Sequence, residues 1–251
     1  MLAFFSRTDY TKIMILLNAV SKSFGKKKVI DNVTLGVHSG EIACLLGPSG
    51  AGKTTLIRLI TGALRADAGE ITVDGIKVPS LKLFERMGFM PQGDALYADL
   101  TGLDNLLFFG GLYRMKGKEL KARAFETLEM LGLLSDKDVL VSKYSGGMKK
   151  RLSLAAALMH RPDFLLLDEP TVGIDPILRQ TIWRQFKSLA AGGACIIVST
   201  HVMDEAAKCD RTALIYGGSL VANDTTENLL KNTPGGNIEE LFFMAKEGKA
   251  C

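Results

Sequence analysis

The stretch Gly47-Pro48-Ser49-Gly50-Ala51-Gly52-Lys53-Thr54 decides the fold of this chain, because it matches the pattern G-x-x-x-x-G-K-[ST] at every fixed position. The almost wholly apolar run at residues 41–46 precedes it and predicts a strand buried on both faces of a sheet. A helix is expected to follow, from residue 53 to about residue 63. Glycines let the loop curl until several backbone N–H groups point at one polyphosphate, and the helix N-terminus adds its positive dipole. The sequence therefore predicts a phosphate-binding loop.

The residues of this loop have distinct expected roles toward a nucleotide. We expect Lys53 to reach the β- and γ-phosphates, Thr54 to offer its hydroxyl to Mg²⁺, and Thr55 to contact the α-phosphate. The whole set expected to bind the nucleotide is Gly47, Pro48, Ser49, Gly50, Ala51, Gly52, Lys53, Thr54 and Thr55. GTPases, kinases and many ATPases share this motif, so other residues must separate these classes.

Two adjacent carboxylates follow a second apolar run. Residues 164–167 read Phe-Leu-Leu-Leu, and Asp168 and Glu169 come directly after them. This pattern predicts a buried strand that ends with its acids at the carboxyl edge of a parallel sheet, where open α/β folds bind ligands. We expect Asp168 to hold Mg²⁺ and Glu169 to polarise a water for attack on the γ-phosphate. General-base help of this kind is worth about 10²–10⁴-fold in rate.

The hydrophobic pattern along the chain predicts an α/β protein with an inserted helical block. Strands are expected at residues 13–20, 29–37, 41–46, 69–73, 164–168, 194–200 and 211–216, with Asp74-Gly75 as a type I′ hairpin turn. Helices are expected at residues 105–113, 118–131, 147–159, 176–191 and 203–208. We therefore predict a P-loop NTPase (RecA-like) core at 13–93 and 161–222, with a mostly parallel sheet and an N-terminal antiparallel part. A leader at 1–12, a helical subdomain at 94–160 and a C-terminal helical tail at 223–251 complete the division.

Composition excludes several classes of protein. The 251 residues are 47% hydrophobic and 23% charged, which is typical of a globular protein. A net charge of +4 is too small for a dedicated nucleic-acid binder. The apolar runs all fall well short of the roughly 18 residues that a membrane-spanning helix needs. The cysteines at positions 44, 195, 209 and 251 form no CxxC pair, and we expect reduced, buried thiols of a cytosolic protein.

A second candidate anion site stands at the end of the helical block. Tyr144-Ser145-Gly146-Gly147-Met148 places a capping hydroxyl and two glycines before an amphipathic helix. A second phosphate site in one chain is explained if two copies face each other and each completes the other's nucleotide site. In these residues the sequence resembles the ATP-binding cassette (ABC) family, the ATPase subunits of ABC transporters, from about residue 13 to residue 228.

The resemblance implies roles for further residues. Phe24 resembles the aromatic residue that stacks on adenine, and Gln92 the glutamine that contacts Mg²⁺ and the attacking water. Ser145, Gly146 and Gly147 resemble the signature that meets the γ-phosphate held by the partner copy. Asp175 resembles the inter-subunit acid, and His201 the switch histidine on the γ-phosphate. The catalytic set implied is Glu169, His201, Gln92 and Lys53, and the metal set is Thr54, Gln92 and Asp168.

The sequence departs from the common family pattern in two segments. Tyr144 and Met148 replace the terminal Leu and Gln of the usual Leu-Ser-Gly-Gly-Gln signature, and a methionine offers no amide for hydrogen bonding. Gly173 and Ile174 stand where a small hydroxyl residue and a leucine are common. Because the serine and both glycines are intact, activity is still expected. Tyr-Ser-Gly-Gly-Met is similar to ATPases of the ABC-2 exporter branch, whose membrane halves are separate chains.

The resemblance therefore implies an ATP-binding and ATP-hydrolysing subunit of an ABC transporter, and more specifically of an exporter. ATP and Mg²⁺ are the expected cofactors. The expected partners are polytopic membrane subunits and a second ATP-binding subunit, in a homodimer or heterodimer at the cytoplasmic face of the cell membrane. No nucleic acid is expected. The alternatives are a non-transport ABC ATPase acting on DNA or ribosomes, and a P-loop kinase or GTPase that turns over as a monomer.

Overall fold

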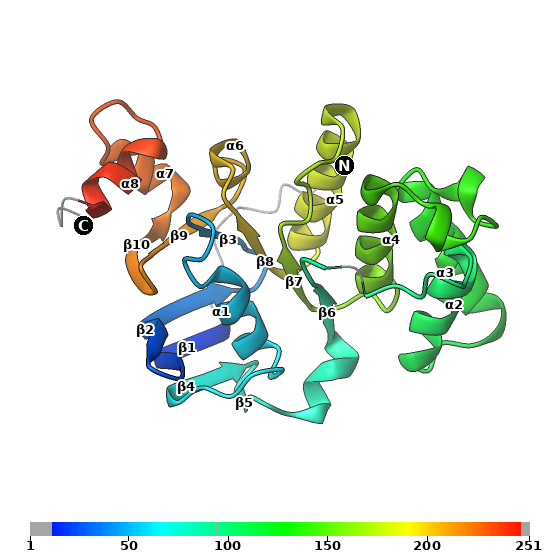
Figure 1. Ribbon diagram of the computed structural model, residues 1–251, viewed down its shortest axis with the longest axis horizontal. Coiled ribbons are helices and arrows are strands. Elements are labelled where there is room, and N and C mark those ends of the chain that lie inside the picture. Colours follow the sequence, from blue (N-terminus) through cyan, green and yellow to red (C-terminus); the bar gives the residue numbers. More distant parts are fainter. Residues whose placement is uncertain (1–11, 94, 247–251) are drawn as a thin grey trace, which may run out of the picture.

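The N-terminal part of the molecule is an antiparallel sheet. The computed structural model describes residues 12–93 and 95–246 (Figure 1). The strand order in this sheet is β2-β1-β4-β5, with β1 at Ile13–Phe24, β2 at Lys27–His38, β4 at Ala68–Val73 and β5 at Ile76–Lys77. Asp74 and Gly75 join the last two strands with φ values of 50° and 74°. Because a type I′ turn needs positive φ at both central residues, the predicted hairpin is confirmed.

The loops that hold the predicted site residues follow strands of a second, six-stranded sheet. Its order is β10-β9-β3-β8-β7-β6. The strands are β3 (Ile42–Leu46), β6 (Met87–Met90), β7 (Phe164–Asp168), β8 (Cys195–Thr200), β9 (Arg211–Tyr216) and β10 (Ser219–Thr225). All neighbouring pairs are parallel except β9 and β10. Because β8 lies between β3 and β7, the loops after these three strands emerge side by side at one edge.

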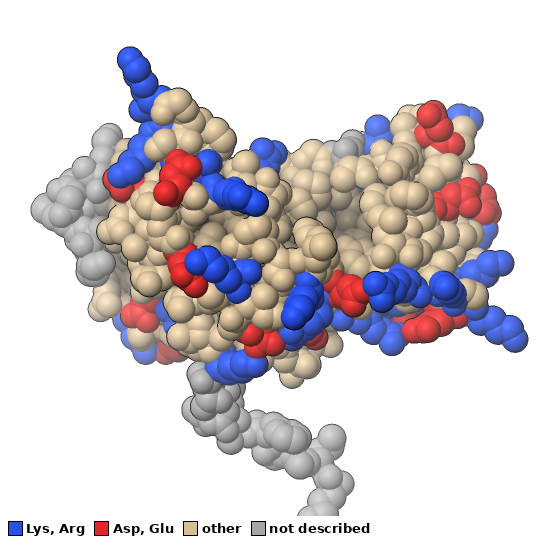
Figure 2. Space-filling view, turned by 90° about the horizontal axis from the view of Figure 1, so that it is seen from below, with Lys and Arg blue, Asp and Glu red and all other residues tan. Residues whose placement is uncertain are grey.

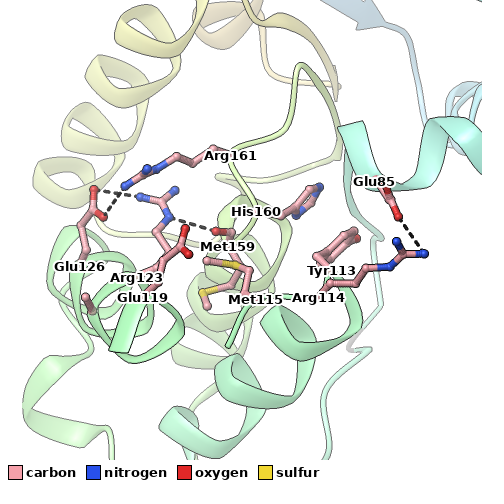
Figure 3. A pocket seen from close by; sticks show the side chains of 11 residues that line it. Glu85, Tyr113, Arg114, Met115, Glu119, Arg123, Glu126, Met159, His160 and Arg161 are labelled. Atoms are coloured by element: carbon pink, nitrogen blue, oxygen red, sulfur yellow. Dashed lines mark hydrogen bonds and ion pairs between the residues drawn. The ribbon is translucent and has the colours of Figure 1, made fainter. Parts of the chain in front are cut away.

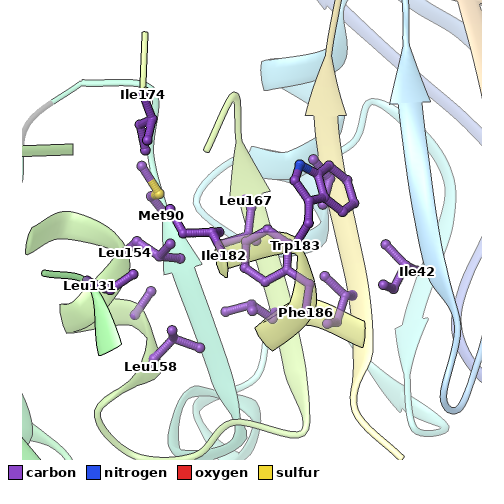
Figure 4. Packing of buried hydrophobic residues seen from close by; sticks show 14 of the residues in the cluster. Ile42, Met90, Leu131, Leu154, Leu158, Leu167, Ile174, Ile182, Trp183 and Phe186 are labelled. Carbon is purple, nitrogen blue, oxygen red and sulfur yellow. The ribbon is translucent and has the colours of Figure 1, made fainter. Parts of the chain in front are cut away.

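Both faces of this sheet are buried, as the apolar runs predict. Alternate residues of each central strand belong to two different hydrophobic clusters, so that Cys44 faces one and Leu45 the other. The helix α5 (Pro176–Ala191) covers the first face with Trp183 and Phe186, whose rings lie 5.6 Å apart (Figure 4). The helix α1 (Lys53–Ile60) and the antiparallel sheet cover the second face. A phosphate-binding loop is thus held between a rigid strand and a buried helix.

Helices form a separate lobe beside the sheets (green in Figure 1). They are α2 (Gly102–Leu112), α3 (Gly117–Met130) and α4 (Gly146–Leu158), with short 3₁₀ turns at Leu134–Asp136 and Val141–Lys143. Arg123 of α3 is buried and donates to the carbonyls of Leu158 and Met159 at 2.6 and 3.1 Å. These carbonyls lie at the end of α4, where that of Leu158 also accepts from the backbone N–H of Arg161 at 3.2 Å. The arginine side chain therefore joins the two helices at a helix end that needs donors.

The remaining elements are short. A 3₁₀ turn, η1, spans Leu81–Arg86. The helix α6 (Met203–Ala206) follows β8, and the helices α7 (Thr226–Lys231) and α8 (Glu239–Lys246) follow β10. Within the described part of the chain, no helix is long and apolar enough to cross a membrane. The cysteines at 44, 195 and 209 are buried and free, and burial raises the pKa of Cys44 and Cys195. Cys251 and the predicted leader, apart from residue 12, lie outside the described residues.

Two strands of the larger sheet were not predicted. β6 has only four residues, and its Gly88 fits against the carbonyl of Ala157, which a Cβ atom would approach to 2.3 Å. Such a short run containing glycine carries no recognisable period. β10 is a polar edge strand that continues to Thr225, into the segment predicted to be purely helical. It pairs with β9 across the two-residue turn Gly217-Gly218, whose φ values are 57° and 86°.

Candidate nucleotide-binding and hydrolysis site

The phosphate-binding loop joins β3 to α1 in a conformation that its glycines permit. Gly52 has a φ of 109°, which residues with a Cβ atom rarely adopt, and it is the N-cap of α1. A Cβ atom on Gly47 would lie 2.4 Å from the carbonyl oxygen of Ile215 in β9. The loop therefore needs glycine at one position for its backbone angle and at the other for close packing.

Lys53 lies at the start of α1 with its side chain folded over the loop. Its Nζ donates to the carbonyl oxygens of Gly47 and Pro48 at 2.6 and 3.0 Å. Burial lowers the pKa of Lys53, and the nearby carboxylates of Glu169 and Asp168 oppose this shift. The loop thus combines a cation with backbone N–H groups at the end of β3, which suits a polyphosphate.

Asp168 ends β7 and is only 1% exposed. One carboxylate oxygen, Oδ1, accepts a hydrogen bond from the hydroxyl of Ser199 on the neighbouring strand β8. The other, Oδ2, is buried and has no hydrogen-bond partner among the described residues. Because a buried carboxylate oxygen is costly to leave unpaired, this atom fits a ligand position for a cation.

Glu169 follows directly and adopts a φ of 53°, unusual for a residue with a side chain. Its backbone N–H donates to the hydroxyl and the carbonyl oxygen of Ser199, both at 3.1 Å. Its carboxylate accepts from Nε2 of Gln92 at 3.3 Å and lies 2.9 Å from Nδ1 of His201. The structure thus brings together three residues that the sequence analysis selected from three separate segments.

Gln92, Glu169 and the phosphate-binding loop border a cavity of about 400 Å³. The described residues that line it come from β1, β2, the phosphate-binding loop, α1, the segment after β6 and the end of β7, and they include Phe24, Thr54, Thr55, Gln92 and Glu169. Phe24 is 49% exposed, and Nζ of Lys22 lies 5.7 Å from its ring centre. An exposed aromatic ring beside a phosphate-binding loop can stack on a nucleotide base.

The predicted signature residues lie on other elements. Ser145 is the N-cap of α4 and accepts from the backbone N–H of Met148 at 3.2 Å. Asp175 caps α5 in the same way, through Leu178 N–H at 2.9 Å. Both capping residues are exposed. A Cβ atom on Gly147 would lie 3.7 Å from the carbonyl oxygen of Gly173, so the two predicted interface segments are neighbours.

A different hollow, of about 340 Å³, lies near the junction of the helical lobe and the core (Figure 3). Tyr113 stacks on His160 with ring centres 3.5 Å apart, and Arg114 forms an ion pair with Glu85 of η1 at 3.4 Å. Burial lowers the pKa of His160 to about 4. Its described lining comes from η1 and the helical lobe, so this hollow is separate from the phosphate-binding loop.

Ser199, Thr171 and Glu205 lie near this site but carry no motif that would predict them from the sequence. Ser199 links Asp168 to the backbone of Glu169, and a buried Glu205 joins Thr171 to the end of β8. The signal that could have pointed to them is the pair of hydroxyl residues, Ser199 and Thr200, at the end of a buried strand. Strand neighbours cannot be assigned from one sequence, so these pairings were not visible.

The fold and the site define a P-loop nucleoside triphosphatase with an inserted helical lobe. A family model described as "ABC transporter" matches residues 30–172, which is more than half of the chain. The chain therefore belongs to the ABC transporter family, as an ATP-binding and ATP-hydrolysing cassette.

Named relatives agree with this assignment. The chain is 42% identical over 233 residues to the Nod factor export ATP-binding protein I of Rhizobium meliloti (strain 1021), covering 92% of this chain and 70% of that protein. It is 39% identical over 231 residues to the linearmycin resistance ATP-binding protein LnrL of Bacillus subtilis (strain 168), covering 91% and 74%.

Solved structures show the same fold. The dimeric structure of a bacterial ABC transporter cassette matches with a TM-score of 0.79 and 29% identity, over 84% of this chain and 98% of that one. A dimeric post-hydrolysis cassette bound to ADP and Pi matches with a TM-score of 0.78 at the same identity and coverage. The predicted family and fold class are thus confirmed.

Proposed function

We propose that the chain is the ATPase subunit of an exporter, and that closure of two facing cassettes around ATP drives a separate membrane subunit. The observation that carries the hydrolytic part is the contact of the Glu169 carboxylate with both Gln92 and His201. In this arrangement a carboxylate base lies between Gln92, which can orient a water molecule, and His201, which can contact the γ-phosphate. The named relatives support export, since one acts in Nod factor export and the other in linearmycin resistance.

The residues around the cavity have separate roles in ATP binding and hydrolysis. Lys53 and the loop N–H groups bind the phosphates, and Phe24 stacks on the base. Thr54, Asp168 and Gln92 supply oxygen ligands of the kind that Mg²⁺ prefers, and Mg²⁺ would neutralise phosphate charge. Among the described residues there is no group of three or more His, Cys, Asp or Glu side chains that could hold a metal.

The second phosphate-binding surface is proposed to act on a facing copy. Ser145, Gly146 and Gly147 lie at the N-terminus of the 13-residue helix α4, and Asp175 lies at the start of α5. Exposed N–H groups at a helix N-terminus attract phosphate. The partner is a second ATP-binding subunit, as the dimeric cassettes among the similar structures support.

The membrane partner is proposed to dock in an apolar hollow of about 340 Å³ between the core and the helical lobe. Phe84, Phe89, Pro91, Leu96 and Phe109 are among its lining residues. Pro91 adjoins Gln92 in the chain, so a helix of the partner seated here would act on the nucleotide site. Such docking would hold the protein at the cytoplasmic face of the membrane.

A role on DNA or ribosomes is the alternative within the family. The net charge of +4 and the mixing of acidic and basic side chains on the face in Figure 2 do not favour it. A kinase or GTPase acting as a monomer is the other alternative. It predicts that Ser145→Arg leaves turnover intact, whereas the facing-copy arrangement predicts loss of turnover.

The test of transport is capture of the partner. Tagged Glu169→Gln protein, with MgATP, is used to isolate complexes from detergent-solubilised source cells, and mass spectrometry identifies them. Ser145→Arg protein treated in parallel controls for contacts that do not need cassette closure. We expect a polytopic membrane protein. Ribosomal or DNA-associated partners alone would overturn the transport function and leave the ATPase chemistry standing.

A further inference from the structure

We propose that Glu205 is a positioning residue that joins the switch His201 and the loop leading to Asp175 into one unit. This inference rests on the proposed function, since it concerns how that site responds to the γ-phosphate. The carboxylate of Glu205 is buried and takes no direct part in the proposed hydrolysis.

Glu205 lies in α6 and is only 1% exposed. Its Oε1 accepts a hydrogen bond from the hydroxyl of Thr171 at 2.5 Å, and its Oε2 accepts one from the hydroxyl of Thr200 at 2.6 Å. Both threonines are fully buried. One side chain thus connects the segment after β7 with the end of β8.

The Thr200 branch fixes the backbone on both sides of His201. The Thr200 hydroxyl donates to Glu205 and also accepts from the backbone N–H of Val202 at 3.0 Å. His201 is the residue between these two, and its ring lies 2.9 Å from Glu169. A shift of Glu205 would therefore move the ring that meets the γ-phosphate.

The Thr171 branch leads to the interface. The carbonyl oxygen of Thr171 accepts from the backbone N–H of Ile174 at 3.3 Å, which forms the turn before Asp175. Asp175 is exposed and caps α5. Glu205 therefore links His201, which is expected to meet the γ-phosphate, to the turn before Asp175, which is expected to meet the facing copy.

A carboxylate is required for both branches at once. Each of its oxygens accepts from one hydroxyl, and such bonds to a charged acceptor are stronger than neutral ones. Glutamine would present one acceptor oxygen and one NH₂ donor, so only one threonine could still donate to it. Glu205→Gln therefore keeps the volume of the side chain but weakens the link, because the charge is lost and the second threonine hydroxyl could only accept from the NH₂ group.

The experiment compares Glu205→Gln with the wild type in steady-state hydrolysis and in nucleotide binding. We expect kcat to fall by about 10- to 100-fold, because a small displacement of reacting groups can slow a reaction by that much. We expect ADP affinity to stay within about twofold, because the phosphate-binding loop is untouched, while the preference for ATP over ADP declines. General destabilisation would not change that preference selectively.

Glu41→Gln is the matched control. Glu41 is also a buried carboxylate, 4% exposed, but it pairs with Arg211 at the opposite ends of the strands. We expect it to lower the free energy of unfolding and to leave kcat and the nucleotide preference unchanged. Thr171→Val tests one branch without altering the carboxylate and should reduce kcat, and Thr171→Ser, which keeps the hydroxyl, should restore it.

Wild-type kcat and nucleotide preference in folded Glu205→Gln protein would overturn the inference. If that variant does not fold, unchanged turnover in Thr171→Val would overturn it instead. Failure of the proposed function looks different, because wild-type turnover would then not respond to Glu169→Gln. That result would refute both the function and this inference.

Discussion

Nδ1 of His201 lies 2.9 Å from Oε1 of Glu169, and the other oxygen of that carboxylate accepts from Gln92 at 3.3 Å. The carboxylate is therefore held from two sides at the border of the nucleotide cavity. Its backbone is held as well, because the N–H of Glu169 donates to Ser199. A base that is fixed in this way needs little rearrangement to act on a water molecule near the γ-phosphate.

Glu169→Gln should bind ATP and hardly hydrolyse it. The amide keeps the shape of the side chain but cannot take up a proton, so we expect kcat to fall by at least about 10²-fold. A closed dimer should accumulate with MgATP, which light scattering after size-exclusion chromatography would detect. Glu70→Gln, at an exposed ion pair on β4, is the control and should hydrolyse normally. Undiminished phosphate release by Glu169→Gln would contradict the assigned role.

Lys53→Ala should abolish stabilisation by ATP. A ligand at 100 times its Kd stabilises the native state by about 2.7 kcal/mol, which a thermal-unfolding assay detects as a rise in Tm. Removal of Lys53 takes away the cation expected to contact the phosphates, so the ATP-dependent rise should disappear. Lys77→Ala, at an exposed lysine on β5, should retain it. An equal rise in both variants would show that ATP binds elsewhere.

The sequence predicted the central fold because its signals are local and strong. Residues 164–168, 176–191 and 211–216 form the elements expected of them. The first is a continuous apolar run that ends in two acids, and the second begins after the capping residue Asp175. The hairpin at Asp74-Gly75 is similarly specified by two residues. β6 was missed because it is short and pairs with the distant strand β7. β10 follows β9 across the turn Gly217-Gly218, and this local hairpin signal was overlooked.

The parts of the site that could be predicted are those in which the functional residues are adjacent in the sequence and form a motif. The loop before Lys53 and the Asp168-Glu169 pair are of this kind. Glu205 was not, because its partners Thr171 and Thr200 come from two other segments and only the order β3-β8-β7 brings them together. The departure at Tyr144 likewise has a physical reason that appears only in the fold.

Tyr144 replaces the usual leucine and is packed into the helical lobe. It is 5% exposed, its hydroxyl donates to the carbonyl oxygen of Asp136 at 2.8 Å, and it occupies the space beside Gly102. A Cβ atom on Gly102 would lie 2.2 Å from that hydroxyl. The tyrosine therefore has a structural role next to the signature and is not among the described residues that line the nucleotide cavity.

Tyr144→Phe should lower the free energy of unfolding by about 1 kcal/mol, since it removes one hydrogen bond and leaves the Asp136 carbonyl without this donor. Turnover should change less than twofold, because Ser145 and both glycines remain. Denaturant titration and an ATPase assay measure the two quantities. Tyr97→Phe, at a half-exposed ring, is the comparison and should leave stability unchanged. A large loss of turnover at constant stability would give Tyr144 a direct part in the signature.

His160 should make stability depend on pH between about pH 6.5 and pH 4. Burial lowers its pKa from 6.5 to about 4 in the folded protein, so in this range the unfolded chain binds more protons than the native one. Where that holds, the free energy of unfolding rises with pH, and the contribution of His160 is complete above pH 6.5 and is lost as the pH falls toward 4. The expected size is about 2 kcal/mol for a partly exposed ring.

The variant His160→Phe isolates this effect. Phenylalanine keeps an aromatic ring on Tyr113 and does not titrate, so the free energy of unfolding should become nearly flat from pH 4.5 to pH 6.5. Carboxylates such as Asp74 and Glu126, whose pKa values ion pairs lower, are present in both proteins, so their loss of stability at acidic pH cancels in the difference. Denaturant titrations of both proteins across this range measure the difference. The same slope in both would mean that the imidazole is protonated inside the fold, and that the Tyr113 stack tolerates the charge.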